Sequence, residues 1–169
     1  MAEIETTRSA RLADQFEAAQ GDFIRLVESL TDVHWRMKGK NTPGTRLNDE
    51  DESRAVGVIA HHVASTQPWI MSRIQAILED KPTPPVDFRI INAEHAEEHA
   101  YATRAEVVAM LRENVRRIAR DVRAIRDDHL DKERQFPAGT MTVQHRIERV
   151  LIGHMKSHQG SIEATTKST

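Results

Sequence analysis

The chain of 169 residues contains no cysteine, and only 4% of its residues are aromatic. Without cysteine it can form neither a disulfide nor a thiolate metal ligand, and it has no cysteine nucleophile. Because aromatic side chains are scarce, the core must be largely aliphatic, which suits packed helices better than a β-sandwich. The length fits one domain, so we expect a single domain over residues 1–169.

The sequence also lacks any run of about 18 apolar residues, the length that a membrane-spanning helix needs. Residues 1–11 are polar and contain no apolar signal region, so a cytoplasmic location is expected. The formal net charge of −2 provides no electrostatic basis for binding nucleic acid or an anionic membrane. We therefore expect a small molecule, not nucleic acid or a membrane, as the partner of this protein.

Apolar residues recur at alternating spacings of three and four over most of the chain. This period places them on one face of a helix. The long helices are expected over residues 12–37, from about 48 to 77, 103–125 and 142–162, with 127–139 as a connection. Pro68 should kink the second of them, because proline lacks a backbone N–H. Four such helices with short connections predict an all-α, four-helix bundle.

Two histidines lie on the apolar stripe of the last expected helix. His154 and His158 continue a row of aliphatic residues that ends at Ile162. Burying an unpaired polar ring costs roughly 1–3 kcal/mol, so each imidazole needs a partner in the core. Two rings one helical turn apart, about 6 Å along the axis, can share one metal ion. The spacing therefore predicts a metal site inside the bundle.

The second expected helix carries two adjacent histidines that could provide a third ligand. His62 lies about 90° from the centre of the inward-facing arc, whereas His61 lies about 170° away. His62 can therefore reach the interior, and His61 should face solvent. Three imidazole ligands leave at least one coordination position open, which is typical of a catalytic metal site rather than a closed structural one.

The segment Val58–Ala64, with both of these histidines, and the segment Gly153–Ile162 resemble the DinB/YfiT-like superfamily of four-helix bundles. The resemblance covers essentially the whole chain. It implies that a histidine of the second helix and the final H-x3-H pair bind a divalent metal. The implied ligands are His62, His154 and His158, with His61 as the alternative on the second helix.

Members of this superfamily include thiol S-transferases and a mycothiol-dependent maleylpyruvate isomerase. The resemblance therefore implies a divalent-metal-dependent enzyme, a thiol-dependent S-transferase or isomerase, with a low-molecular-weight thiol as cosubstrate. All-imidazole ligation suits zinc, nickel, copper or iron, and zinc and nickel are the ions we expect. Two alternatives stay open: a metal-dependent hydrolase, and a non-catalytic bundle that binds a metal or a small ligand.

His95 and His99 form a second H-x3-H pair, flanked by acidic residues. They lie in the less regular segment 87–100, for which a short helix over one end of the bundle is expected. Because the sequence offers them no convincing third ligand, a role beside the first site is favoured over a separate metal site. His95 is the first candidate for a catalytic acid–base group.

Arg73 follows Trp69 by one helical turn and could hold a substrate carboxylate bidentately, although a surface salt bridge explains it equally well. Three apolar residues lie off the main apolar stripes, which favours a homodimer. They are Val27, Val107 and Met110.

Overall fold

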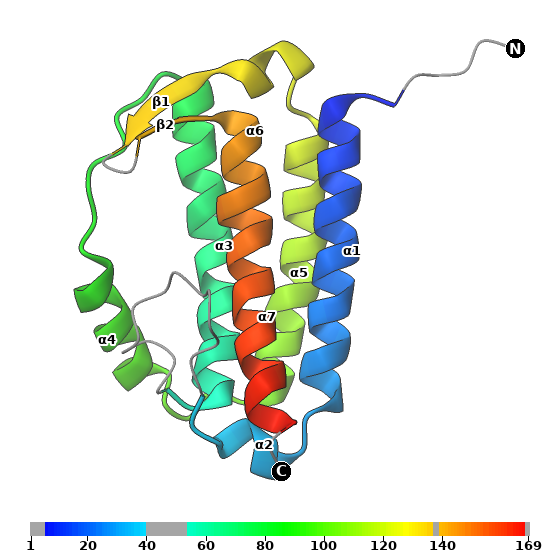
Figure 1. Ribbon diagram of the computed structural model, residues 1–169, viewed down its shortest axis with the longest axis vertical. Coiled ribbons are helices and arrows are strands. Elements are labelled where there is room, and N and C mark those ends of the chain that lie inside the picture. Colours follow the sequence, from blue (N-terminus) through cyan, green and yellow to red (C-terminus); the bar gives the residue numbers. More distant parts are fainter. Residues whose placement is uncertain (1–5, 40–53, 137–138, 168–169) are drawn as a thin grey trace, which may run out of the picture.

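The computed structural model describes residues 6–39, 54–136 and 139–167 of the chain. Four long helical rods lie side by side and enclose the core (Figure 1). They are α1 (Arg8–Ser29), α3 (Val56–Leu78), α5 (Arg104–Arg123), and a continuous rod of α6 (Val143–Arg146), η3 (Ile147–Ile152) and α7 (Gly153–Thr166). The predicted all-α, four-helix bundle is therefore confirmed.

Shorter elements cover the ends and one side of the bundle. They are α2 (Asp32–Arg36), α4 (Phe88–Glu98), the 3₁₀ helix η2 (Asp127–Asp131), β1 (Glu133–Phe136) and β2 (Gly139–Thr142). The two strands pair antiparallel, with Glu133 opposite Thr142. The segment 127–139, expected as a plain connection, thus contains a helical turn and half of a β-hairpin. No helix among the described residues combines the length and the apolar character needed to cross a membrane.

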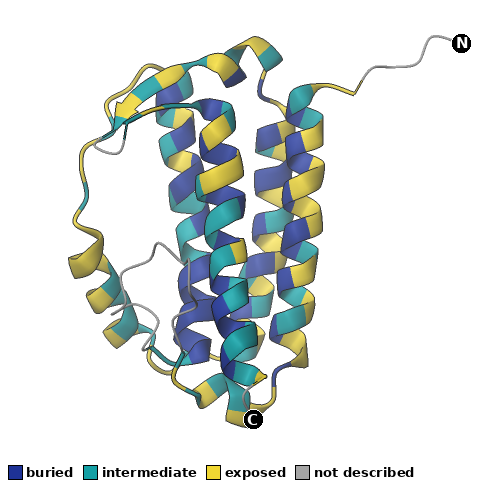
Figure 2. Cartoon of the chain, viewed as in Figure 1, coloured by how far each residue is buried: buried dark blue, intermediate teal, exposed yellow. Residues whose placement is uncertain are grey.

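The core is aliphatic, as the composition predicts. Buried residues line the inner faces of the four long rods, whereas α4 has none (Figure 2). The largest fully buried side chains are mostly isoleucine and leucine, and Phe16 and Phe23 of α1 are the aromatic ones among them. Each such side chain contributes on the order of 1.5–3 kcal/mol to folding through its removal from water.

The first helix is shorter than its apolar period predicts. It ends at Ser29, and Leu30 is extended, with ψ 136°. Thr31 then begins α2, because its hydroxyl accepts a hydrogen bond from the backbone N–H of His34. Val33, expected in the apolar stripe, is 70% exposed as a result. The prediction of one helix over residues 12–37 was therefore wrong at its C-terminal third.

The expected start of the second helix, near Asn48, lies outside the described residues. In the described part, α3 begins at Val56, whose N–H donates to the carbonyl oxygen of Met37 at 2.9 Å. Gly39 likewise donates to the carbonyl of Arg54 at 2.8 Å. These two bonds hold Arg54 immediately before the helix that carries His61 and His62.

Candidate metal centre

Three histidines converge from two helices that pack against each other. His62 comes from α3, and His154 and His158 come from α7. The Nε2 atom of His154 lies 3.2 Å from Nε2 of His62 and 3.2 Å from Nε2 of His158. The three histidines that the sequence predicts as ligands are thus brought together, each with one nitrogen within 4.8 Å of the other two.

The spacing of these nitrogens fits a bound divalent metal. Zinc–nitrogen bonds of 2.0–2.1 Å in a tetrahedral site imply nitrogen–nitrogen edges of about 3.3 Å. Without a cation, Nε2 of His154 faces two ring nitrogens but has a single lone pair or a single hydrogen to offer. It cannot make two good hydrogen bonds at once, whereas a cation can accept a lone pair from every ring.

The surroundings also keep these imidazoles neutral, which is the form that binds a metal. Burial lowers the pKa of His62 far below its ordinary value, and the neighbouring His154 and His158 lower it further. Desolvation lowers the pKa of His154 to about 3, with additional contributions from His158 and from the guanidinium of Arg54. Little proton release is therefore needed when a cation binds.

A π-helical turn precedes the two histidines of the last rod. In η3 the N–H of Gly153 bonds to the carbonyl of Glu148, five residues earlier. Such turns are wider than an α-helical turn and often occur at functional sites. A Cβ at position 153 would lie 3.2 Å from that carbonyl oxygen, so glycine fits here better than larger residues. The sequence predicts a regular helix over residues 142–162, and the π-helical turn corrects that prediction.

The burial of His61 contradicts another prediction from the sequence. The sequence predicts a solvent-facing side chain, but His61 is only 8% exposed. Its Nδ1 atom lies 2.8 Å from Nε2 of His95, and its ring stacks on that of His99 with centroids 3.9 Å apart. The reason is tertiary: α4 packs against α3 and covers the face on which His61 lies. The adjacent histidines of α3 therefore belong to two different clusters.

Arg54 and Ser65 also lie near these clusters, and sequence reasoning missed both. The positive charge of Arg54 contributes to the lowered pKa values of His62, His95 and His154, so its guanidinium lies close to both groups of rings. The hydroxyl of Ser65 lies 3.3 Å from Nε2 of His95. Arg54 precedes α3 and belongs to no periodic pattern, so the sequence has no signal that singles it out.

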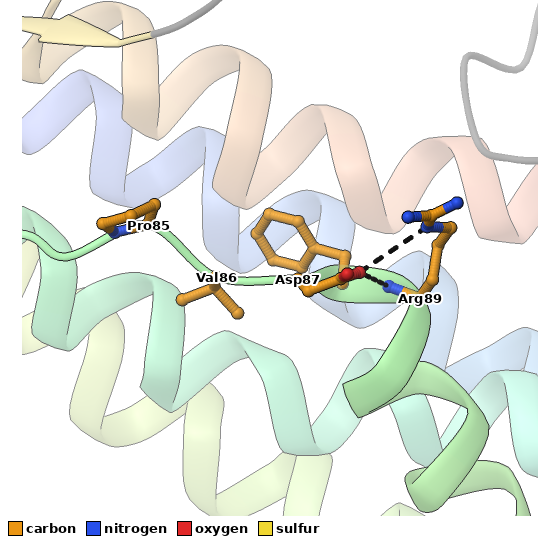
Figure 3. A pocket seen from close by; sticks show the side chains of 5 residues that line it. Pro85, Val86, Asp87 and Arg89 are labelled. Carbon is orange, nitrogen blue, oxygen red and sulfur yellow. Dashed lines mark hydrogen bonds and ion pairs between the residues drawn. The ribbon is translucent and has the colours of Figure 1, made fainter.

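Arg73 of α3 is half-buried, and its hydrogen bond and its ring contact involve no histidine. It donates to the carbonyl oxygen of Pro84 at 2.9 Å, and its guanidinium lies over the ring of Trp69 at 4.9 Å. A surface pocket opens just beyond Pro84, in the link between α3 and α4 (Figure 3). It is lined by Pro85, Val86, Asp87, Phe88 and Arg89. No histidine lines this pocket, so it is separate from the candidate metal centre.

The chain is thus a four-helix bundle in which three imidazoles from two helices form a candidate internal metal site. The chain belongs to the DinB superfamily, whose model matches residues 15–162. The chain matches no curated protein.

Two solved structures share the fold. One is an uncharacterised protein from Escherichia coli UTI89, with a TM-score of 0.70 and 12% identity, where the match covers 98% of this chain and 95% of that chain. The other is an uncharacterized protein from Clostridium difficile 630, with a TM-score of 0.65, 13% identity and coverage of 94% and 95%. At these identities the likeness shows the fold alone.

Proposed function

We propose that this protein is a divalent-metal-dependent enzyme in which His62, His154 and His158 hold the ion. The observation that carries the proposal is the pair of 3.2 Å distances between Nε2 of His154 and the other two Nε2 atoms. Three protein ligands leave a coordination position for a water or substrate, as in catalytic zinc sites. Membership of the DinB superfamily is consistent with this assignment.

The reaction we favour is the thiol-dependent transfer or isomerisation of a small molecule. A bound zinc or nickel ion would lower the pKa of a coordinated thiol or water and so supply a nucleophile at neutral pH. The chain has no cysteine, so the thiol must come from a cosubstrate. Neutral imidazole ligands leave the full charge of the ion in place, which favours an anionic ligand such as a thiolate.

Arg54 strengthens that preference. Its guanidinium is close enough to His62 and His154 to lower the pKa of both rings. The same charge stabilises an anion held beside these rings, because charges interact more strongly where water is largely excluded. Arg54 therefore takes the role of an anion-binding residue in the proposed function. The role of Arg73 in holding a substrate carboxylate stays a prediction.

His95 is the nearest additional acid–base group. Its ring centroid lies 5.5 Å from that of His62, with the rings nearly perpendicular. Burial and the neighbouring His61 and His99 lower its pKa to about 4, so it is neutral at pH 7 and able to accept a proton. The sequence-based choice of His95 as the first acid–base candidate is thereby retained as a proposal.

The test is metal analysis of purified protein, followed by thiol binding to the cobalt-substituted form. We expect His62→Ala and His154→Ala each to remove one equivalent of metal per chain. His145→Ala is the matched control, since this histidine is exposed on the same helical rod. We also expect low-molecular-weight thiols to change the visible spectrum of the cobalt form. Full metal content in His154→Ala, or a spectrum that no thiol perturbs, would contradict the proposal.

A further inference from the structure

We propose that His61, His95 and His99 form a second metal site beside the first, suited to a divalent transition metal such as zinc, nickel or cobalt. The two sites share no ligand, so this inference does not depend on the first metal site. A metal bound to His95 would replace the acid–base role proposed for that ring above. It also assigns a role to the second H-x3-H pair of the sequence, for which α3 supplies the third ligand.

The second cluster repeats the construction of the first. Each combines one histidine of α3 with a pair spaced four residues apart on another helix. His95 lies in the last turn of α4, and His99 is the residue that caps its C-terminal end. One nitrogen from each of the three rings lies within 4.8 Å of the other two. This arrangement meets the requirement for three imidazole ligands on one ion.

A hydrogen-bonded cluster without metal explains less of the geometry. The 2.8 Å distance between Nδ1 of His61 and Nε2 of His95 is also that of an ordinary hydrogen bond. That bond joins two of the rings and leaves the third, His99, stacked on His61 with centroids 3.9 Å apart and without a polar role. A shared cation uses all three rings.

Two carboxylates lie beside the second cluster and favour a cation there. Glu98 has a carboxylate oxygen 4.0 Å from Nε2 of His99. Glu106, at the start of α5, lies close enough to His61 and His99 for these rings to contribute to the lowered pKa of its carboxyl group. The positive charge of Arg54 acts on His95 as well as on the first site, and at the second cluster these two carboxylates oppose it. Both carboxylates are exposed, so their effect is modest beside that of the ligands.

The two sites are adjacent because their ligands on α3, His61 and His62, are consecutive residues of one helix. Consecutive residues of an α-helix point about 100° apart, so His61 and His62 reach different neighbours, α4 and α7. The rings of His62 and His95 are in edge-to-face contact, with centroids 5.5 Å apart. A ligand held at the first ion would therefore lie next to the second site, where an ion could bind or polarise it.

The experiment is titration of the metal-free full-length protein with Zn²⁺, with bound metal quantified after desalting. We expect two equivalents in the wild-type protein, one in His99→Ala, one in His154→Ala and none in the double variant. The loss of affinity at the altered site should exceed the roughly 10–100-fold that removal of an outer hydrogen-bond partner causes. His145→Ala should retain both equivalents.

The outcomes separate the two proposals. Suppose that the wild-type protein binds one equivalent of Zn²⁺, and that His154→Ala loses it while His99→Ala keeps it. This result would overturn the second site and leave the first intact. If His99→Ala instead loses the single equivalent and His154→Ala keeps it, the second site is supported and the first is overturned. Because His99 is half-buried at a helix end, its truncation leaves the core unchanged, and circular dichroism checks this. His99→Asn is the second variant; two equivalents retained in both folded variants would overturn the proposal.

Discussion

The side-chain amide of Asn114 replaces the hydrogen-bond donor that Pro68 lacks. In a regular helix the N–H of residue 68 would bond to the carbonyl of Ala64, but proline has no N–H. The Nδ2 atom of Asn114, from α5, donates to that carbonyl at 2.7 Å. The same Nδ2 lies 3.0 Å from Oε1 of Gln67, which also pairs with Gln20. This buried network ties three helices together at the proline.

Removing this amide should destabilise the protein. Asn114→Ala leaves the Ala64 carbonyl buried without a donor, at a cost of about 1–3 kcal/mol in the free energy of unfolding. In a Pro68→Ala background the restored N–H satisfies that carbonyl, so the same change should cost less. Urea unfolding of the four proteins measures the coupling. Equal costs in the two backgrounds would show that Asn114 does not act through this carbonyl.

Substitution of Gly57 should be costly, whereas substitution of Gly160 should not. A Cβ at position 57 would lie 2.4 Å from Nε1 of Trp35, which donates to the carbonyl of Ala102 at 2.9 Å. Gly57→Ala must displace this ring, and overpacking of this kind costs about 1–3 kcal/mol. Gly160 has open space around its Cβ position, so Gly160→Ala should be neutral or stabilise the helix by up to about 1 kcal/mol.

Thermal unfolding of these two glycine variants provides the comparison. The ring of Trp35 also anchors the chain just after His99, because Ala102 is its acceptor. We therefore expect Gly57→Ala to weaken metal binding at His61, His95 and His99 more than at the first site. A Gly57→Ala protein as stable as its Gly160→Ala counterpart would show that Trp35 moves without cost.

The metal-free protein should lose stability as the pH falls below about 6.5. Desolvation lowers the pKa of His154 to about 3, and His62 shifts in the same direction, with Arg54 and His158 adding to both shifts. Between the unfolded and folded pKa values the unfolded chain binds protons that the folded chain does not, so unfolding becomes easier. Each such histidine contributes a slope of up to about 1.4 kcal/mol per pH unit, and above pH 6.5 the slope disappears.

Urea unfolding of the metal-free protein between pH 7.5 and 5 measures this slope. That window lies above the lowered pKa values of the carboxyl groups of Asp127, Asp128 and Asp131, whose contribution is lost only at lower pH. His154→Gln cannot take up a proton, so it should have a smaller slope than the wild type. An unchanged slope in this variant would exclude His154 as a source of the pH dependence.

Neutralising Arg54 should weaken anion binding at the first site without removing the metal. Arg54→Gln removes the charge that lowers the pKa of His62 and His154, so these values should rise, as histidine NMR titration of the metal-free protein can measure. Thiolate affinity of the cobalt form should fall by roughly tenfold, about 1.4 kcal/mol. Arg54→Lys keeps the charge and should restore most of the affinity; equal loss in both variants would indicate a structural role.

Four helices, an aliphatic core and the meeting of His62 with the pair His154 and His158 could be predicted from the sequence. The helices and the inward direction of these histidines follow from helical periodicity, the aliphatic core follows from the composition, and the meeting of the three rings was implied by the family resemblance. Local chemistry could have revealed the break at Leu30 as well, since Thr31 is a good N-cap, but the unbroken apolar period outweighed it.

Only the tertiary structure decided the environment of His61 and the role of Asn114. His61 faces away from the apolar stripe of its own helix, and it is buried because α4, some thirty residues further along the chain, packs over it. Asn114 meets a carbonyl fifty residues earlier in the sequence. A local period fixes the direction of a side chain relative to its own helix. What it meets there depends on which other segment packs against that face, and the pattern within one helix does not encode this.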